Sequence, residues 1–131
     1  MANLTVKHEG GLASSINVRG FQVMVDTPAQ FFGDNRGPMP SELLTGALGS
    51  CIIFFIGRWC QRAGLPYEGV RVEIEYVLSI EQNCVPVIKV EIFMPENFPA
   101  ERNEEMLQAA RRCTMHNTLC NPPQIEFRVG G

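Results

Sequence analysis

Two of the five cysteines stand where a thiol could do chemistry. Cys51 lies inside the apolar segment PSELLTGALGSCIIFFIGRWC, residues 40–60, and Cys113 follows Arg111 and Arg112. An odd number of cysteines without a C-x-x-C pair does not fit a framework of structural disulfides. A thiol attacks as a nucleophile only when its thiolate is stabilised, whereas apolar burial alone raises its pKa. A charged group must therefore reach these sulfur atoms before they can react.

The segment around Cys51 predicts one helix that is apolar on nearly every side between Leu43 and Ile56. At about 100° per residue, Cys60 points away from Cys51. The residues that share the face of Cys51 are Leu44, Ala47, Leu48, Phe54, Phe55 and Arg58. Glu42 is the nearest acid in the sequence, yet it lies about 13 Å of helical rise and half a turn away. An acid or arginine from this region can therefore act on Cys51 only from a symmetry-related chain.

The same helix predicts that two chains interlock. A domain of 131 residues has little protein with which to enclose a helix that is apolar on several sides. Gly46 and Gly49 each cost about 1 kcal/mol of helix propensity relative to alanine, so close approach by another element should compensate. We expect an intertwined homodimer with sites at its interface. Arg58 is expected to reach solvent past the helix end instead of turning back to Cys51.

Alternating apolar and polar residues predict strands on both sides of this helix, which indicates an α+β fold. The other predicted elements are a small antiparallel sheet with strands at 4–8 and 21–25, a hairpin of strands at 70–81 and 88–94 joined through EQNCVP, a helix at 101–113, and a last strand at 125–129. Turns are predicted at Gly10-Gly11 and Arg19-Gly20. No repeat or linker interrupts the pattern, so residues 1–131 are expected to form a single domain.

Charge and hydropathy restrict the class of partner. The net charge is -3 and the basic residues are scattered, which does not favour a nucleic acid. The apolar run from Leu43 to Ile56 is shorter than the roughly 20 residues that a bilayer requires. The N-terminus, MANLTVKHEGG, has no apolar stretch typical of an export signal. We therefore expect a cytoplasmic protein without a membrane partner.

The cysteines also have simpler interpretations. In a reducing compartment a cysteine is usually a small buried hydrophobe. Cys113, His116 and Cys120 have spacings that could suit a metal, but without a fourth ligand the zinc signal is weak. Cys113 is predicted at the C-terminus of its helix, where a thiolate is disfavoured. Cys113 is therefore better suited to react with a neighbouring cysteine that has already reacted than to be the first attacking thiol.

The motifs of the chain occur in a distinctive order. They are Asp26, Pro28, Gly37-Pro38-Met39-Pro40, Glu42-Leu43-Leu44, Ala47-Leu48-Gly49-Ser50-Cys51 and Cys113-Thr114-Met115-His116-Asn117-Thr118-Leu119. This order resembles the OsmC-like family, which includes osmotically induced proteins and organic hydroperoxide resistance proteins, over nearly the whole chain. The resemblance implies an α+β fold in which two chains interlock, with antiparallel sheets packed around long central helices.

The resemblance also implies peroxide reduction by two thiols. Cys51 would attack a hydroperoxide and become a sulfenic acid, and Cys113 would condense with it to a disulfide. An external dithiol, of a lipoyl type in many relatives, would reduce that disulfide, so no metal or other cofactor is implied. A pocket lined by Phe54 and Phe55 would suit an organic hydroperoxide, because such a pocket favours alkyl groups.

The chain departs from the peroxidase branch of this family at several places, one of which is Thr114, where relatives commonly have proline. Ser41 holds the position of the glutamate that directly follows the motif proline, and the acid comes one residue later, at Glu42. The first hairpin lacks the arginine expected there, which leaves Arg19 and Arg36 as candidates. The sequence therefore resembles the broader OsmC-like branch, and Glu42 and Arg36 are the residues expected to assist Cys51.

Two other functions are compatible with the same residues. The protein could be a non-catalytic or carrier-type dimer that binds a small apolar or electrophilic ligand. Alternatively, all five cysteines could be packing residues of a structural dimer. An unreactive Cys51 in a dimer that still binds apolar ligands would favour the carrier, and a Cys51→Ser variant without any effect would favour the structural dimer.

Overall fold

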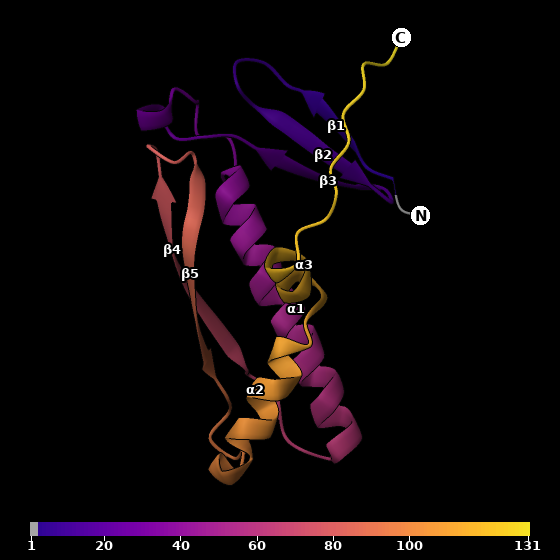
Figure 1. The fold of residues 1–131 in the computed structure, drawn as a ribbon, viewed down its shortest axis with the longest axis vertical. Helices are drawn as coiled ribbons and strands as arrows, with labels where there is room; N and C mark the ends of the chain where they lie inside the picture. Colours follow the sequence, from indigo (N-terminus) through magenta and orange to yellow (C-terminus); the bar gives the residue numbers. More distant parts are fainter. Residues whose placement is uncertain (1–2) are drawn as a thin grey trace. The chain divides into compact units, whose positions relative to one another are not determined.

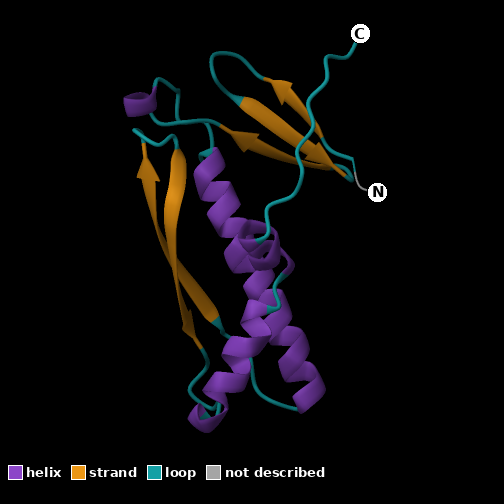
Figure 2. Cartoon of the chain, in the orientation of Figure 1, coloured by secondary structure: helices purple, strands orange, loops and turns teal. Residues whose placement is uncertain are grey.

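Residues 3–131, which the computed structural model describes, form three α-helices and two antiparallel sheets (Figures 1 and 2). The predicted α+β class is therefore confirmed. The chain divides into two units, Met1–Thr45 and Gly46–Gly131. The expectation of one domain over residues 1–131 stays a prediction, as does the homodimer.

The sheet of the first unit contains three strands in sequence order. They are β1 (Thr5–His8), β2 (Ser14–Val18) and β3 (Phe21–Val25). Strand β2 lies between the two strands that the alternation predicted. The exposed apolar side chains of this region are Leu4, Val6, Leu12, Phe21 and Val23. A sheet normally buries one apolar face, so these side chains leave an uncovered surface in the single chain.

The predicted turn at Arg19-Gly20 is confirmed. It joins β2 to β3, in which Val18 pairs with Phe21. Both turn residues have positive φ angles, 49° at Arg19 and 86° at Gly20. A two-residue hairpin loop with positive φ at both positions matches the twist of its strands, and it favours glycine because glycine has no Cβ to clash.

A buried carboxylate organises the loop after β3. Asp26 accepts hydrogen bonds from the backbone N–H groups of Thr27 at 2.7 Å, Arg36 at 3.1 Å and Asp34 at 3.3 Å. These donors, led by Thr27, lower the pKa of the Asp26 carboxyl group. The short helix η1 (Ala29–Phe31) lies within the same loop. The motif aspartate therefore holds the loop's backbone in shape.

Helix α1 (Pro40–Ala63) is the long helix that the apolar segment predicted. Pro40 is its first residue, a position where the missing N–H costs nothing. The Glu42 Oε1 atom accepts a hydrogen bond from the Met39 backbone N–H at 2.7 Å. Met39 is the cap residue of this helix, and Glu42 lies three residues after it. When the acid at this position accepts a hydrogen bond from the backbone N–H of the cap residue, it forms the second half of a capping box. Glu42 therefore stabilises the start of α1.

Strands β4 (Arg71–Ser79) and β5 (Cys84–Phe93) form the predicted long hairpin of the second unit. Strand β5 begins at Cys84, earlier than predicted, so EQNCVP belongs only in part to the connection. The register shifts between Val77 and Ser79. This irregularity breaks the single apolar face that was predicted for 70–81, and Leu78 and Ile80 are exposed.

The second predicted helix is two helices. After a short turn, η2 (Ala100–Arg102), α2 (Asn103–Arg111) carries acids in its first turn and an arginine in its last, as predicted. The chain then bends at Cys113 and begins α3 (Thr114–Cys120), which was not predicted. Thr and Asn have low intrinsic helix propensity, so the segment resembled a loop in sequence.

The prediction of a strand at residues 125–129 is wrong. Residues 122–131 form no helix or strand, and the side chains of Ile125, Phe127 and Val129 are exposed by 71%, 94% and 99%. Alternation indicates that a segment can pair as a strand, but a strand also needs a neighbour with free backbone groups. No segment of the described residues pairs with this one.

Helix α1 carries the core of the second unit. The buried side chains of α1 pack with side chains from the loop before α2, from α2 and from the bend after it. The members of this core cluster are Leu48, Ile52, Ile56, Cys60, Phe98, Met106, Ala110 and Cys113. By length and composition alone α1 could cross a membrane, with 39% of its most apolar window buried in the chain. Core helices pass the same test, and Ile56 and Cys60 are fully buried here.

Candidate functional site: two thiols between α1 and α3

Cys51 and Cys113 meet in the second unit. Cys51 lies in the middle of α1, and Cys113 lies at the bend between α2 and α3. Cys51 packs against the core cluster that contains Cys113, and its proximity contributes to a raised pKa at Cys113. The two cysteines are 62 positions apart in the sequence, so only the packing of α3 against α1 can bring them together. The structure therefore pairs the two sulfurs that the sequence singled out.

Cys113 is a buried thiol at the N-terminal cap of α3, and not the C-terminal residue that was predicted. Its side chain is fully buried, and its Sγ atom accepts a hydrogen bond from the His116 backbone N–H at 3.4 Å. Burial raises the pKa of Cys113 most, and the hydrogen bond and negative charge of Cys51 raise it further. The backbone donors His116 and Met115 act in the opposite direction but do not prevail. Cys113 therefore keeps its proton.

Cys51 lies at the edge of the core and is half-buried. On one side of it, Leu48 and Ile52 of α1 are buried. On the other side, Ala47 and Phe54 are exposed. A position on this boundary places the sulfur against the buried core that contains Cys113 and next to the exposed face of α1.

Arg58 does not turn back to Cys51. Its Nη1 atom donates a hydrogen bond to the Gln61 Oε1 atom at 2.6 Å, and Gln61 donates to the Tyr67 hydroxyl at 2.8 Å. The side chain is thereby drawn toward the C-terminal end of α1, and Arg58 is exposed, as the sequence predicted. Arg58 therefore does not supply the charge that would stabilise a Cys51 thiolate.

The other two predicted site residues lie in the first unit, where both have structural contacts. Arg36 donates a hydrogen bond from Nη1 to the Glu9 carbonyl oxygen at 2.6 Å, and its backbone N–H donates to Asp26. Glu42 caps α1 through Met39. Both side chains are exposed, so each could also meet another chain. Their assistance to Cys51 stays a prediction.

Phe54 and Phe55, the residues expected to line the substrate pocket, line a shared cavity. Their rings pack edge to face with centroids 5.3 Å apart. The cavity has a volume of about 270 Å³, and its lining residues are Phe54, Phe55, Arg58, Trp59, Arg62, Ala109 and Arg112. Cys51 is not among them. A hydroperoxide here would reach Cys51 only along α1, so the role of this cavity as a substrate pocket stays a prediction.

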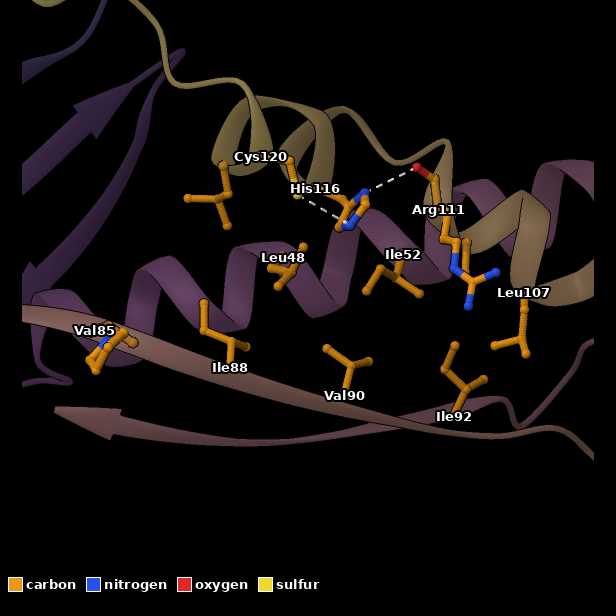
Figure 3. Close-up of a pocket in the computed structure, with 13 residues that line it drawn as sticks. Leu48, Ile52, Val85, Ile88, Val90, Ile92, Leu107, Arg111, His116 and Cys120 are labelled. Carbon is orange, nitrogen blue, oxygen red and sulfur yellow. Dashed lines mark hydrogen bonds between the residues drawn. The ribbon is translucent and has the colours of Figure 1, made fainter.

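A larger cavity, of about 530 Å³, was missed by the sequence (Figure 3). It is mostly aliphatic, and its lining residues are Leu48, Ile52, Val85, Pro86, Ile88, Val90, Ile92, Leu107, Ala110, Arg111, His116, Leu119 and Cys120. Its polar side comes from the end of α2 and from α3. Because α3 was not predicted, nothing in the sequence analysis placed His116 and Cys120 opposite strand β5.

The remaining cysteines show no metal site. Among residues 3–131, no group of three His, Cys, Asp or Glu side chains is placed to hold a metal ion, so Cys113, His116 and Cys120 do not converge as ligands. Cys60 is buried in the core, where desolvation raises its pKa, and Cys84 is exposed at the start of β5. Cys60 therefore serves as a packing residue.

Comparison with solved structures shows the same fold in several bacterial proteins. A protein described as an osmotic stress induced and detoxification response protein from Psychrobacter arcticus superposes with a TM-score of 0.82 at 19% identity, covering 90% of this chain and 88% of its own. An OsmC-like protein from Mycoplasma pneumoniae gives 0.79 at 16% identity, with 93% and 89% covered.

The organic hydroperoxide resistance protein OhrB of Bacillus subtilis gives a TM-score of 0.62 at 15% identity, with 93% of this chain and 92% of its own covered. No curated protein sequence matches the chain at a significant level. The family model of the OsmC-like proteins matches residues 33–128, which include both Cys51 and Cys113. On this match, and with the fold in agreement, the chain belongs to the OsmC-like protein family.

Proposed function

We propose that this protein is a thiol-dependent peroxidase that reduces organic hydroperoxides. The observation that carries the proposal is the pair of neighbouring thiols, Cys51 and Cys113, one half-buried at the edge of the core and the other fully buried within it. Membership of a family that includes hydroperoxide resistance proteins supports the same chemistry. The two sulfurs supply both electrons that one peroxide bond takes up when it is reduced.

Atoms and electrons balance over three steps. The Cys51 thiolate attacks the terminal oxygen of the hydroperoxide, the O–O bond breaks, and an alcohol leaves after taking a proton. Cys51 is now a sulfenic acid. The Cys113 sulfur then attacks the Cys51 sulfur, a disulfide forms, and water leaves. An external dithiol, for which a lipoyl type is the expected reductant, exchanges with this disulfide and restores both thiols.

The environments of the two sulfurs assign their order. The Cys113 side chain is fully buried, so a peroxide in solvent does not reach its sulfur atom. Its pKa is also raised, which disfavours the thiolate that would attack a peroxide. Cys51 is the more accessible sulfur, at the edge of the core. Attack by Cys51 and resolution by Cys113 therefore follow from burial. Cys113 in turn lies in contact with Cys51, as a resolving thiol must.

A homodimer would complete the site. Cys51 borders an exposed apolar face of α1 where Phe54 is 59% exposed, and the chain supplies further uncovered apolar side chains at β1, β3 and the C-terminal segment. A second chain that covers the α1 face would close the site to water. Glu42 and Arg36 of that symmetry-related chain are the groups proposed to hold the Cys51 thiolate, since Arg58 points away.

The substrate and location follow from the same features. Mostly aliphatic side chains line the cavity of about 530 Å³, and aromatic side chains line that of about 270 Å³ beside three arginines, which favours an alkyl hydroperoxide over hydrogen peroxide. The reductant must be external, because Cys113 is the only cysteine whose contact with Cys51 the structure records among the described residues. A reducing compartment, the cytoplasm, would supply that dithiol.

One equivalent of cumene hydroperoxide added to the reduced protein tests the proposal. Peptide mass spectrometry should find a Cys51–Cys113 disulfide in the wild type and in a Cys84→Ser control, whose thiol is exposed but remote from the pair. Cys51→Ser should consume no peroxide, and Cys113→Ser should consume peroxide and leave Cys51 oxidised beyond the sulfenic acid. Unchanged peroxide consumption by Cys51→Ser would refute the proposal, whereas a protein whose thiols all stay reduced would favour the ligand-carrier function.

A further inference from the structure

We propose that Cys120 and His116 form a second nucleophilic thiol, which covalently captures α,β-unsaturated aldehydes with an apolar tail in the aliphatic cavity. The Cys120 Sγ atom lies 3.5 Å from the His116 Nε2 atom, and both residues line the cavity of about 530 Å³ (Figure 3). The peroxidase chemistry uses neither side chain. This inference is independent of the proposed function, because it involves a different sulfur and a histidine side chain that the peroxidase chemistry does not use.

The hydrogen bonds of His116 determine which ring nitrogen carries the proton. The His116 Nδ1 atom lies 3.2 Å from the Arg111 carbonyl oxygen, which can only accept a hydrogen bond. Nδ1 must therefore donate, and the neutral ring keeps its lone pair on Nε2. That lone pair faces the Cys120 sulfur. His116 is thus oriented to take the thiol proton, in the arrangement by which a base activates a cysteine nucleophile.

The cavity selects the apolar part of the ligand. Leu48 and Ile52 of α1 and Ile88, Val90 and Ile92 of β5 face the space beside His116 (Figure 3). A hydrocarbon chain that leaves water for this surface gains roughly 0.8 kcal/mol for each buried CH₂ group. The polar groups lie together at one side of the cavity, so a bound molecule would place its tail against β5 and its reactive end at Cys120.

The guanidinium group of Arg111 supplies a charge for the reactive end. Its side chain points into the cavity on the same side as His116 (Figure 3). A carbonyl oxygen that becomes negative during the reaction is stabilised by such a donor. An aldehyde conjugated to a carbon–carbon double bond develops charge on oxygen in this way, and a thiolate is the soft nucleophile that attacks its β-carbon.

The addition balances without any co-reactant. His116 Nε2 takes the proton of Cys120, the sulfur bonds to the β-carbon, and the electron pair of the double bond moves toward the carbonyl oxygen as an enolate. The imidazolium then returns its proton to the α-carbon. The product is a thioether that retains the aldehyde group, and no atom changes partner outside these bonds.

Cys84 is a matched control for Cys120. Both thiols are exposed, but the nearest polar atom recorded for the Cys84 Sγ is the Gln82 Oε1 atom at 3.7 Å, which is not a base of comparable strength. Treating the reduced protein with limiting trans-2-nonenal at pH 7 and measuring thioether formation at each cysteine by peptide mass spectrometry compares them directly. Cys120 should react about 100-fold faster than Cys84, the lower end of what a positioned base contributes.

Two further arms separate the base from the cavity. His116→Gln should slow Cys120 by about 100-fold and leave Cys84 unchanged, while its backbone hydrogen bond to Cys113 is retained. Acrolein, which has the same reactive group without a tail, should reduce the advantage of Cys120 over Cys84. Equal rates at Cys120 and Cys84 with nonenal, or a His116→Gln variant that folds as the wild type by circular dichroism and reacts at the wild-type rate, would overturn the inference.

Discussion

Truncation of Phe54 tests whether the exposed face of α1 is the dimer interface. Phe54 lies one turn after Cys51 and is 59% exposed in the single chain. In the proposed dimer its ring is covered by the second chain. A Phe54→Ala change should therefore weaken association strongly, while it costs the fold of one chain little, because most of the ring has no intrachain contact to lose.

The magnitude follows from the exposed fraction. A phenylalanine has roughly 200 Å² of surface, so 59% exposure leaves about 120 Å² for a partner to bury. At about 25 cal/mol per Å², full burial contributes about 3 kcal/mol for each chain, and about 6 kcal/mol for a symmetric dimer in which the side chain occurs twice. The Kd for dissociation should therefore rise by up to about 10⁴-fold.

Sedimentation velocity over a dilution series measures this Kd. Phe54→Leu is the matched control, because it keeps an apolar side chain of similar reach and should leave most of the affinity. Peroxide consumption at a concentration where only Phe54→Ala dissociates then shows whether Cys51 needs the second chain. A Kd for Phe54→Ala within threefold of wild type, or a wild type that stays monomeric at every soluble concentration, would show that this face is not the interface.

Four other outcomes follow. If Arg36 acts across the dimer interface, an equal mixture of Cys51→Ser and Arg36→Gln chains should regain about a quarter of wild-type peroxidase activity. Half of the dimers are then mixed, and each mixed dimer has one intact site out of two. No recovery of activity after subunit exchange would argue against a role of Arg36 across the interface. Cys51→Ala should lower the pKa of Cys113, read from alkylation rate against pH, because both contributions of Cys51 raise it; an equal or higher pKa is the contrary result. Above about pH 9 the free energy of unfolding of the reduced protein should fall by up to about 1.4 kcal/mol per pH unit for each buried thiol. The reason is that a thiol in the unfolded chain ionises in this range, whereas burial raises the pKa of Cys60 in the folded chain. Urea titrations at several pH values measure this slope, and Cys60→Ala should flatten it. Gly37→Ala should cost about 1–3 kcal/mol in the same titration, because a Cβ there would overlap a backbone carbonyl of β3, and wild-type stability would contradict this.

The elements predicted correctly are those with strong local patterns. Helix α1 is apolar over several turns, and the hairpin of β4 and β5 alternates over most of its length, so periodicity alone was enough. The turn at Arg19-Gly20 was readable because few residues adopt its backbone angles. The motif order further placed Cys51 and Cys113 in one site, which no local pattern could do.

The errors lie where tertiary contacts decide the structure. Helix α3 has a polar, β-branched sequence, and it forms because Cys113 caps it and because the chain must return across α1. The strand predicted at 125–129 has the right alternation but no partner strand among the described residues. Missing α3 also hid the Cys120–His116 pair, since both of its residues belong to that helix.

The contact between the two thiols can time the reaction as well as permit it. In the reduced protein, burial and the neighbouring Cys51 raise the pKa of Cys113, so in the proposed mechanism the resolving sulfur would not compete for peroxide. In the proposed reaction Cys51 becomes a sulfenic acid, which lacks the thiolate charge, so the coulombic contribution of Cys51 to the raised pKa of Cys113 is lost. The backbone N–H of His116, which favours the Cys113 thiolate, is then opposed chiefly by burial. In the proposed mechanism, oxidation of Cys51 thus prepares the thiol that must next attack it, and this electrostatic effect reinforces the order of steps that burial favours.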